Sequence, residues 1–248
     1  MKPVPITSDA EHAGASGGVP ASTESLVAPE PVERPALIET MRMGAGRTLP
    51  LLDHHLDRLE RSCHALSYSW PGRHEIIQRL QSATAALDTS REWRVRMLLA
   101  ADGILHLEYA PLHPLPSPLH LVVAGPRISG AEPWLLYKTT HRPWYETASA
   151  WLARRPDIFD VIFWNAEGEI CEGSRSNVYI LSKEGQWLTP PLAAGALPGV
   201  QRQLLLESGK AHESVITREQ FLNARTWRVS NALRGWCTAV LRPTPPEL

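Results

Sequence analysis

The sequence predicts an α+β protein folded in two lobes. Two stretches rich in strand-forming residues each carry segments with helical periodicity. Between them, residues 111–118 contain four prolines, which is typical of a connection between domains. We therefore expect a small α/β lobe over residues 36–112, a linker over 113–118 and a larger lobe over 119–248.

The first 35 residues differ in composition from the rest of the chain. They are rich in Pro, Ala, Gly, Ser and Glu and contain few large apolar side chains. Such a segment buries too little surface to offset the entropy lost on ordering, so we expect a disordered tail over residues 1–35. The start has one basic residue and no continuous apolar stretch, so it does not resemble a secretory signal.

In the small lobe, residues 36–43 form an expected strand, and Gly44–Gly46 a turn before a short second strand over residues 47–52. Asp53 occupies the expected N-cap of a helix. The apolar face of that helix is formed by residues at helical spacing, namely Leu56, Leu59, Cys63 and Leu66. A second helix is expected over residues 74–87. Asp102-Gly103 predicts a hairpin joining strands over residues 93–100 and 104–111.

The larger lobe is expected to begin with a strand over residues 119–125. A helix follows over residues 143–155, with Pro143 in its first turn. Further expected elements are strands over 159–165 and 177–182 with a turn at Glu167-Gly168 between them, a helix beginning near Gly199, and a strand pair around 226–231 and 236–241.

Composition excludes several classes of function. Lys plus Arg total 25 against 26 Asp plus Glu, a formal net charge of −1, so neither nucleic acid nor an anionic membrane is an expected partner. No run approaches the roughly 18–20 apolar residues that span a bilayer. Cys63, Cys171 and Cys237 are odd in number and far apart, which indicates neither a disulfide framework nor a metal site. We expect a cytoplasmic protein without a metal.

Two ionisable residues are candidates for chemistry. Lys138 follows an apolar stretch; most such lysines lie at the surface, but a partly desolvated amine has a lowered pKa and can form Schiff bases. Glu172 follows strand-like residues and could be a solvated turn carboxylate. A buried carboxylate is also what keeps the ring nitrogen of a pyridoxal cofactor protonated.

Two further features suit an anion. Pro198-Gly199 precedes an expected helix, whose free backbone N–H groups could bind a phosphate or simply start an ordinary helix. Arg58 lies on the first helix, where ion pairs with Asp57 and Glu60 would explain it without a ligand. His54 and His55 are adjacent and point in different directions, so they make an unlikely metal pair.

Taken in order, five segments resemble the fold-type IV pyridoxal-phosphate enzymes, the class IV aminotransferase family. They are HHLDRLERS, KTTHR, NAEGEICEGSRSNVYI, TPPLAAGALPGVQR and VSNALRG, and the resemblance runs from about Ala36 to Leu241. It implies pyridoxal 5'-phosphate (PLP) as cofactor and a larger lobe built as a pseudo-barrel. It also implies a Schiff base on Lys138, Glu172 at the pyridine nitrogen with Asn177 following, and contacts to the phosphate. The implied phosphate contacts are Arg58, Gly199, Val200, Gln201, Ser230 and Asn231.

Within the family, LIETMRM, KTTHRPWYE and SNALRGW are similar to the 4-amino-4-deoxychorismate lyase subgroup, including lyase-like domains fused behind aminodeoxychorismate synthase. This similarity implies cleavage of aminodeoxychorismate to p-aminobenzoate and pyruvate in folate biosynthesis, a homodimer, and a functional link to the synthase. The candidates for contacting substrate carboxylates are Thr40, Arg96, Arg142 and Arg175. A branched-chain or D-amino acid transaminase and an inactive interaction module derived from a synthase fusion remain alternatives.

The sequence departs from the family pattern in two places. Typical members have two more strands before the position of Ala36, which implies either a less complete small lobe or a domain that once followed a synthase. Gln201 stands where many transaminases have threonine. We therefore expect one hydroxyl contact to the cofactor phosphate to be absent.

Overall fold

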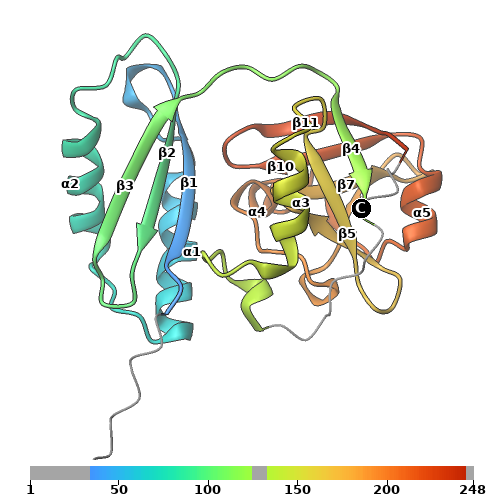
Figure 1. The fold of residues 1–248 in the computed structure, drawn as a ribbon, viewed down its shortest axis with the longest axis horizontal. Coiled ribbons are helices and arrows are strands. Elements are labelled where there is room, and N and C mark those ends of the chain that lie inside the picture. The colour runs from blue at the N-terminus through green and yellow to red at the C-terminus, as the bar shows by residue number, and fades with distance from the viewer. Residues whose placement is uncertain (1–33, 125–132, 244–248) are drawn as a thin grey trace, which may run out of the picture. The chain divides into compact units, whose positions relative to one another are not determined.

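The computed structural model describes residues 34–124 and 133–243 (Figure 1). The tail expected over residues 1–35 thus lies outside the described residues, apart from its last two. The described chain contains a three-stranded sheet and an eight-stranded sheet, each with its own helices. The predicted α+β class with two lobes is confirmed.

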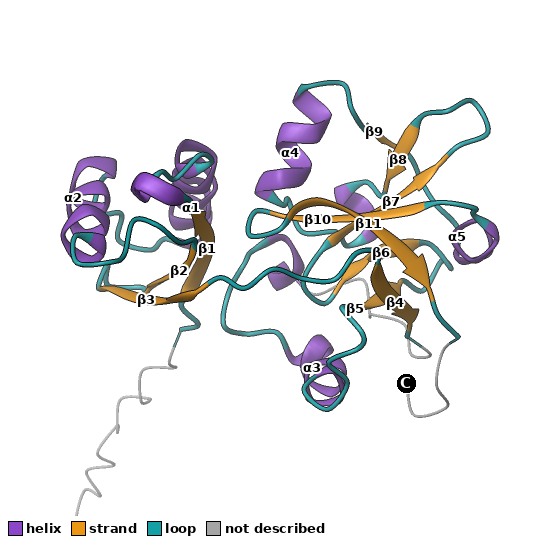
Figure 2. Ribbon diagram, turned by 90° about the horizontal axis from the view of Figure 1, so that it is seen from above, coloured by secondary structure: helices purple, strands orange, loops and turns teal. Residues whose placement is uncertain are grey.

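The small lobe is an antiparallel sheet with the order β1-β2-β3, covered by two helices. Its elements are β1 (Leu37–Met43), α1 (Leu52–Leu66), α2 (Arg73–Thr84), β2 (Trp93–Leu99) and β3 (Leu105–Pro111). Figure 2 shows α1 and α2 on the same face of this sheet. Buried side chains between them form one apolar core, which includes Leu37, Met41, Leu56, Leu59 and Ile76. Strands β2 and β3 pair across Asp102-Gly103, as expected, and Gly103 has a φ of 91° that favours glycine.

The short strand expected over residues 47–52 is wrong. A 3-10 turn, η1 (Ala45–Arg47), follows Gly44, and residues 48–51 lead from it to α1 without forming a strand. Gly46 and Arg47 have φ values of 70° and 62°, which turn the chain, and Pro50 has no N–H to donate to a strand ladder. The N-cap expected at Asp53 is also wrong.

Helix α1 begins two residues earlier than that prediction, at Leu52, with Leu51 in the cap position. No side chain caps this helix. Asp53 instead lies in the first turn, where its negative charge interacts favourably with the helix dipole.

The larger lobe is built on a curled sheet with the order β6-β5-β4-β11-β10-β7-β8-β9. Its strands are β4 (Leu119–Val123), β5 (Asp160–Trp164), β6 (Ile170–Gly173), β7 (Asn177–Leu181), β8 (Trp187–Thr189), β9 (His212–Glu213), β10 (Trp227–Asn231) and β11 (Gly235–Leu241). Its helices are α3 (Glu146–Leu152), α4 (Val200–Glu207) and α5 (Arg218–Asn223), with 3-10 turns η2 (Pro133–Leu136), η3 (Pro143–Tyr145) and η4 (Leu192–Ala194). The N–H of Gly173 donates to Ser176 O at 2.7 Å, which brings the end of edge strand β6 back beside β7.

The central strands of this sheet are buried on both faces. Leu121 and Ile162 point into a core that includes Phe221 of α5, whereas Val122 and Val161 point into the core beneath α3. This alternation follows from the two-residue period of a strand. Helices α3 and α4 lie on opposite sides of the sheet (Figure 2).

Two strand contacts bring distant segments together. The N–H of Ile38 in β1 donates to Lys138 O at 2.7 Å, and the N–H of Thr140 donates to Ala36 O at 2.9 Å. In the larger sheet, the register of β10 and β7 places Ser230 opposite Asn177. These contacts set the backbone around the candidate residues. Among the helices of the described chain, none is long and apolar enough to cross a membrane.

Candidate active site

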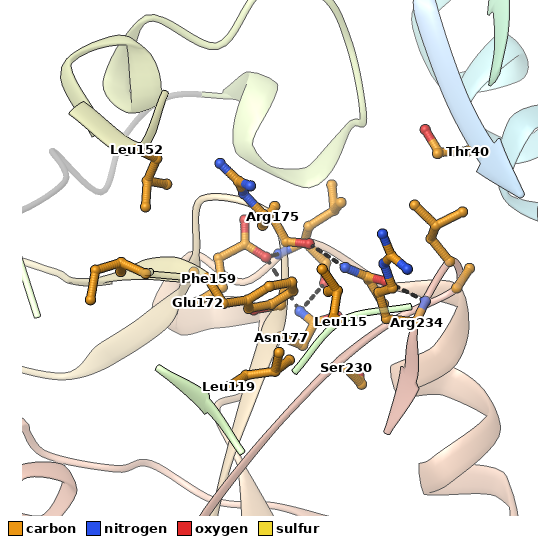
Figure 3. A pocket seen from close by; sticks show the side chains of 18 of the residues that line it. Thr40, Leu115, Leu119, Leu152, Phe159, Glu172, Arg175, Asn177, Ser230 and Arg234 are labelled. Atoms are coloured by element: carbon orange, nitrogen blue, oxygen red, sulfur yellow. Dashed lines mark hydrogen bonds between the residues drawn. The ribbon is translucent and has the colours of Figure 1, made fainter. Parts of the chain in front are cut away.

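Side chains from both sheets line one pocket of about 610 Å³. This volume lies within the range of small-molecule sites, roughly 300–1,000 Å³. The candidates that line it are Thr40, Arg58, Lys138, Arg142, Glu172, Arg175, Asn177, Gly199, Val200, Ser230 and Asn231. In Figure 3 the apolar side chains of Leu119, Leu152 and Phe159 lie on one side, and Thr40 and Arg234 on the other.

Lys138 is held at the pocket by the pairing of its segment with β1. Its side chain is partly buried. Burial, together with the positive charges of Arg142 and Arg58, lowers the pKa of Lys138 from 10.5 to about 7, although Glu39 opposes the shift. A large fraction of such an amine is neutral at neutral pH, which is the form that attacks a carbonyl carbon.

Glu172 is the third of the four residues of strand β6 and is buried. Oε1 accepts a hydrogen bond from the Tyr145 hydroxyl at 2.7 Å, and Oε2 accepts from the Leu197 N–H at 3.0 Å and from Asn177 Nδ2 at 3.3 Å (Figure 3 shows the contact to Asn177). Burial raises the pKa of Glu172, while Arg142 and the donors lower it. The carboxylate is therefore suited to a further cationic donor from the pocket.

Arg58 is fixed by a buried carboxylate that the sequence did not reveal. Glu39 accepts hydrogen bonds from Arg58 Nε at 2.9 Å and Nη2 at 2.5 Å, and from His55 Nδ1 at 2.5 Å. Burial works to raise the pKa of Glu39, but Arg58 and His55 lower it to about 2. The alternative that Arg58 pairs with Asp57 and Glu60 is wrong, because both of these acids pair with Arg73.

The start of α4 lines the pocket next to Arg58. Gly199 is the N-cap and no side chain caps the helix, so its first N–H groups have no intrahelical acceptor. A Cβ on Gly199 would lie 2.0 Å from Asn177 Oδ1, which explains the glycine. Arg58 Nη1 donates to Pro198 O at 3.2 Å and brings its positive charge to this helix start. Together they suit a phosphate.

Asp160 supports the segment that carries Glu172, and the sequence did not reveal this either. It is fully buried at the start of β5, and burial raises its pKa. It accepts hydrogen bonds from the hydroxyls of Ser174 at 2.6 Å and Ser176 at 2.5 Å and from the Arg175 N–H at 3.2 Å. Asp160 therefore fixes the turn between Glu172 and Asn177 by hydrogen bonds to three consecutive residues.

Two candidates are not brought to the pocket. Gln201 lies in the first turn of α4 but does not line the pocket, and Arg96 does not line it either. Arg96 lies on β2, 3.8 Å from Glu108. The pocket instead includes Arg234, which the sequence reasoning missed although it lies within the VSNALRG segment.

The pocket contains more positive than negative charge. Arg142 lies over the ring of Tyr145 at 4.4 Å, and Arg234 Nη1 donates to His113 O at 2.5 Å. Within residues 34–124 and 133–243, no carboxylate pairs with Arg142, Arg175 or Arg234. The same part of the chain holds no group of three or more His, Cys, Asp and Glu placed to bind a metal.

These residues fit PLP chemically. The phosphate matches the uncapped helix start with Arg58, the aldehyde matches the Lys138 amine, and a protonated ring nitrogen matches the buried Glu172 carboxylate. These groups come from four separate segments of the chain. The pocket therefore meets the chemical requirements of this cofactor.

Comparison with known proteins supports the same conclusion. The protein named "Putative aminodeoxychorismate lyase" from Schizosaccharomyces pombe is 32% identical over 203 residues, which is 79% of this chain and 86% of that protein. The "Probable branched-chain-amino-acid aminotransferase" of Thermotoga maritima is 44% identical over 64 residues, 25% of this chain and 23% of that protein. The crystal structure of a "Putative amino-acid aminotransferase" from Mesorhizobium loti is 32% identical, with a TM-score of 0.77, and the match covers 84% of this chain and all of that one.

A family model described as amino-transferase class IV matches residues 36–240, nearly the whole described chain. Members of this family are PLP-dependent enzymes. The chain therefore belongs to the class IV aminotransferase family.

Proposed function

We propose that the protein is a 4-amino-4-deoxychorismate lyase that forms p-aminobenzoate and pyruvate. The positive charge left in the pocket carries this proposal. With the cofactor phosphate at Arg58 and the start of α4, the guanidinium groups of Arg142, Arg175 and Arg234 remain without carboxylate partners in the described chain. Asp157 also lines the pocket, but it pairs with Arg155.

Unpaired charges in a partly desolvated site favour an anionic ligand. Aminodeoxychorismate carries two carboxylates, whereas a branched-chain amino acid carries one and an apolar side chain. The similarity to the Schizosaccharomyces pombe protein over most of both chains supports the same choice. Of the substrate candidates, Thr40, Arg142 and Arg175 line the pocket, and Arg234 joins them.

Each residue has a role in this proposal. Bound PLP supplies an electron sink for the bond that breaks next to the substrate's amino group. The Lys138 amine holds the cofactor and, when neutral, takes the proton from the carbon that bears that amino group. Glu172 keeps the ring nitrogen protonated and Asn177 orients this carboxylate. The cofactor phosphate would be held by Arg58, Gly199, Val200, Ser230 and Asn231.

A transaminase is the second candidate. Leu119, Leu152 and Phe159 form an apolar side of the pocket that would accept a branched side chain (Figure 3). The segment shared with the Thermotoga maritima protein also favours this activity. Both reactions use Lys138 and Glu172, so these two residues cannot separate them.

The deciding experiment measures p-aminobenzoate by fluorescence, with cofactor-loaded protein and aminodeoxychorismate generated in situ. We expect formation that falls at least about 100-fold in Lys138→Ala, because the base is lost. Lys183→Ala, an exposed lysine outside the pocket, is the matched control and should retain full activity. A yellow protein that makes a keto acid but no p-aminobenzoate would favour the transaminase. A protein that stays colourless with PLP would favour the inactive interaction module.

We further propose a cytoplasmic homodimer that takes its substrate from aminodeoxychorismate synthase, as a step toward folate. The resemblance of the LIETMRM and SNALRGW segments to synthase-fused domains supports this link. Light scattering of the purified full chain would test the dimer: a monomer mass would contradict it.

A further inference from the structure

Tyr145 makes a buried hydrogen bond to the carboxylate at the centre of the site. It closes the 3-10 turn η3 and is 2% exposed. Its hydroxyl lies 2.7 Å from Glu172 Oε1. Burial and the negative charge of Glu172 raise the pKa of Tyr145 well above 10, so the phenol keeps its proton and donates it to the carboxylate.

The ring of Tyr145 has little freedom to turn away from Glu172. It contacts Phe163 edge-on with centroids 4.9 Å apart and Trp144 at 5.9 Å, and the Arg142 guanidinium lies 4.4 Å from the ring centroid. Tyr145 does not itself line the pocket. Its ring supports Arg142, and its hydroxyl acts on a ligand through Glu172.

We propose that Tyr145 is a positioning residue whose hydroxyl keeps Glu172 ionised and aimed at the ring nitrogen of PLP. The proposal rests on the assignment of Glu172 made under the proposed function. Tyr145 belongs to the lyase-like segment KTTHRPWYE, but the resemblance gave it no role, and its partner Glu172 lies 27 residues further along the chain.

The ionisation of Glu172 depends on groups from several elements. Burial and Asp160 of β5 favour the neutral acid, whereas Arg142, the Tyr145 hydroxyl and the Leu197 N–H favour the carboxylate. Asn177 of β7 donates to the same carboxylate, and the neighbouring Cys171 thiol has its own pKa raised to about 12, so it carries no charge. The loss of one donor therefore moves the balance toward protonated Glu172.

The test is the Kd of the full-length apo-protein for PLP, measured by fluorescence quenching from mildly alkaline to mildly acidic pH. Tyr145→Phe keeps the ring and removes only the donor. We expect the ratio of its Kd to the wild-type Kd to grow on acidification, to about tenfold, which corresponds to loss of one hydrogen bond to a charged group. The titrations of PLP itself cancel in this ratio.

Two further variants make the result decisive. In a Glu172→Gln background, which has no carboxylate to protonate, Tyr145→Phe should give a ratio independent of pH. Tyr68→Phe removes a hydroxyl that donates to Pro35 O in the small lobe, so its Kd should equal the wild-type value at every pH.

A pH-independent ratio for Tyr145→Phe, with Glu172→Gln altering the wild-type pH dependence, would overturn the role of Tyr145 alone. If Glu172→Gln kept the wild-type dependence, the assignment of Glu172 would be wrong and this inference with it.

Discussion

Glu39 shows how much of the site depends on one buried charge. Its side chain is 2% exposed, yet its two oxygens hold both Arg58 and His55. A buried carboxylate is costly to desolvate, and two hydrogen-bonded partners offset that cost. The guanidinium of Arg58 is thereby oriented toward Pro198 before any ligand binds.

We predict that Glu39→Gln lowers the free energy of unfolding by about 3–5 kcal/mol at neutral pH, since it leaves Arg58 buried with an incomplete partner. The pKa of Glu39 falls from 4.5 to about 2 on folding. The stabilisation that ionised Glu39 gives the folded protein is therefore complete above pH 4.5 and is lost as the pH falls toward 2. Urea denaturation measures the free energy of unfolding of both proteins at neutral pH and at a pH between about 2 and 4.5. The difference between wild type and Glu39→Gln should be smaller at the acidic pH.

The control is Glu92→Gln, which removes an exposed partner of Arg42. That substitution should cost less than about 1 kcal/mol. A penalty for Glu39→Gln that stays constant with pH would contradict the buried ion pair.

Sequence motifs identified the residues whose roles depend on chemical type and spacing. Lys138 and Glu172 were predicted in this way, and both line the pocket. Glu39, Tyr145 and Asp160 were not, because each gains its importance from partners 14 to 27 residues away that only the fold brings near. Single-sequence periodicity carries no information about such contacts.

At the level of elements, β7 and the start of α4 pack against each other without room for a side chain at residue 199. Asn177 donates to Glu172 and to Leu197 O at 3.0 Å, and its Oδ1 occupies the space where a Cβ of residue 199 would stand. The backbone of Gly199 has a φ of −68°, which any residue can adopt. Glycine is thus required there by space and not by conformation.

We predict that Gly199→Ala weakens PLP binding at least about tenfold and costs about 1–3 kcal/mol of stability, because the new methyl group displaces Asn177 and the start of α4. Equilibrium dialysis against PLP and thermal unfolding measure the two effects. Gly44→Ala is the matched control: its φ is also negative, and its Cβ would meet the tip of the Thr48 side chain, which can move. Equal losses in both variants would show that the effect is not local to the pocket.

Long periodic elements were predictable from the sequence and short ones were not. Helices α1 and α2 and the β2–β3 hairpin appear where expected. Strands β8 and β9 contain only three and two residues, too few to show a period. Strand β6, which follows the predicted turn at Glu167-Gly168, has only four. Residues 47–52 contain an apolar run typical of a strand, but Pro50 has no N–H to pair with a neighbouring strand.

At the scale of the whole described chain, each lobe has its own apolar core, and polar contacts join the lobes around the pocket. Strand β1 pairs with the Lys138 segment, and Arg58 of α1 donates to Pro198 O before α4. A ligand held by Arg58 and the start of α4 would bind both lobes at once. Its binding energy should therefore stabilise both.

We predict that PLP slows hydrogen exchange in both α1 and α4. At a PLP concentration of about 100 times Kd, the free energy of the opening that permits exchange should rise by at most about 2.7 kcal/mol. Helix α2 contributes no residue to the pocket and serves as the internal control, since its exchange should change only through global unfolding. Amide exchange followed by mass spectrometry, with and without PLP, resolves the three helices. Protection confined to α4 would mean that Arg58 does not hold the phosphate, and the pocket would then draw its anion contacts from the larger lobe alone.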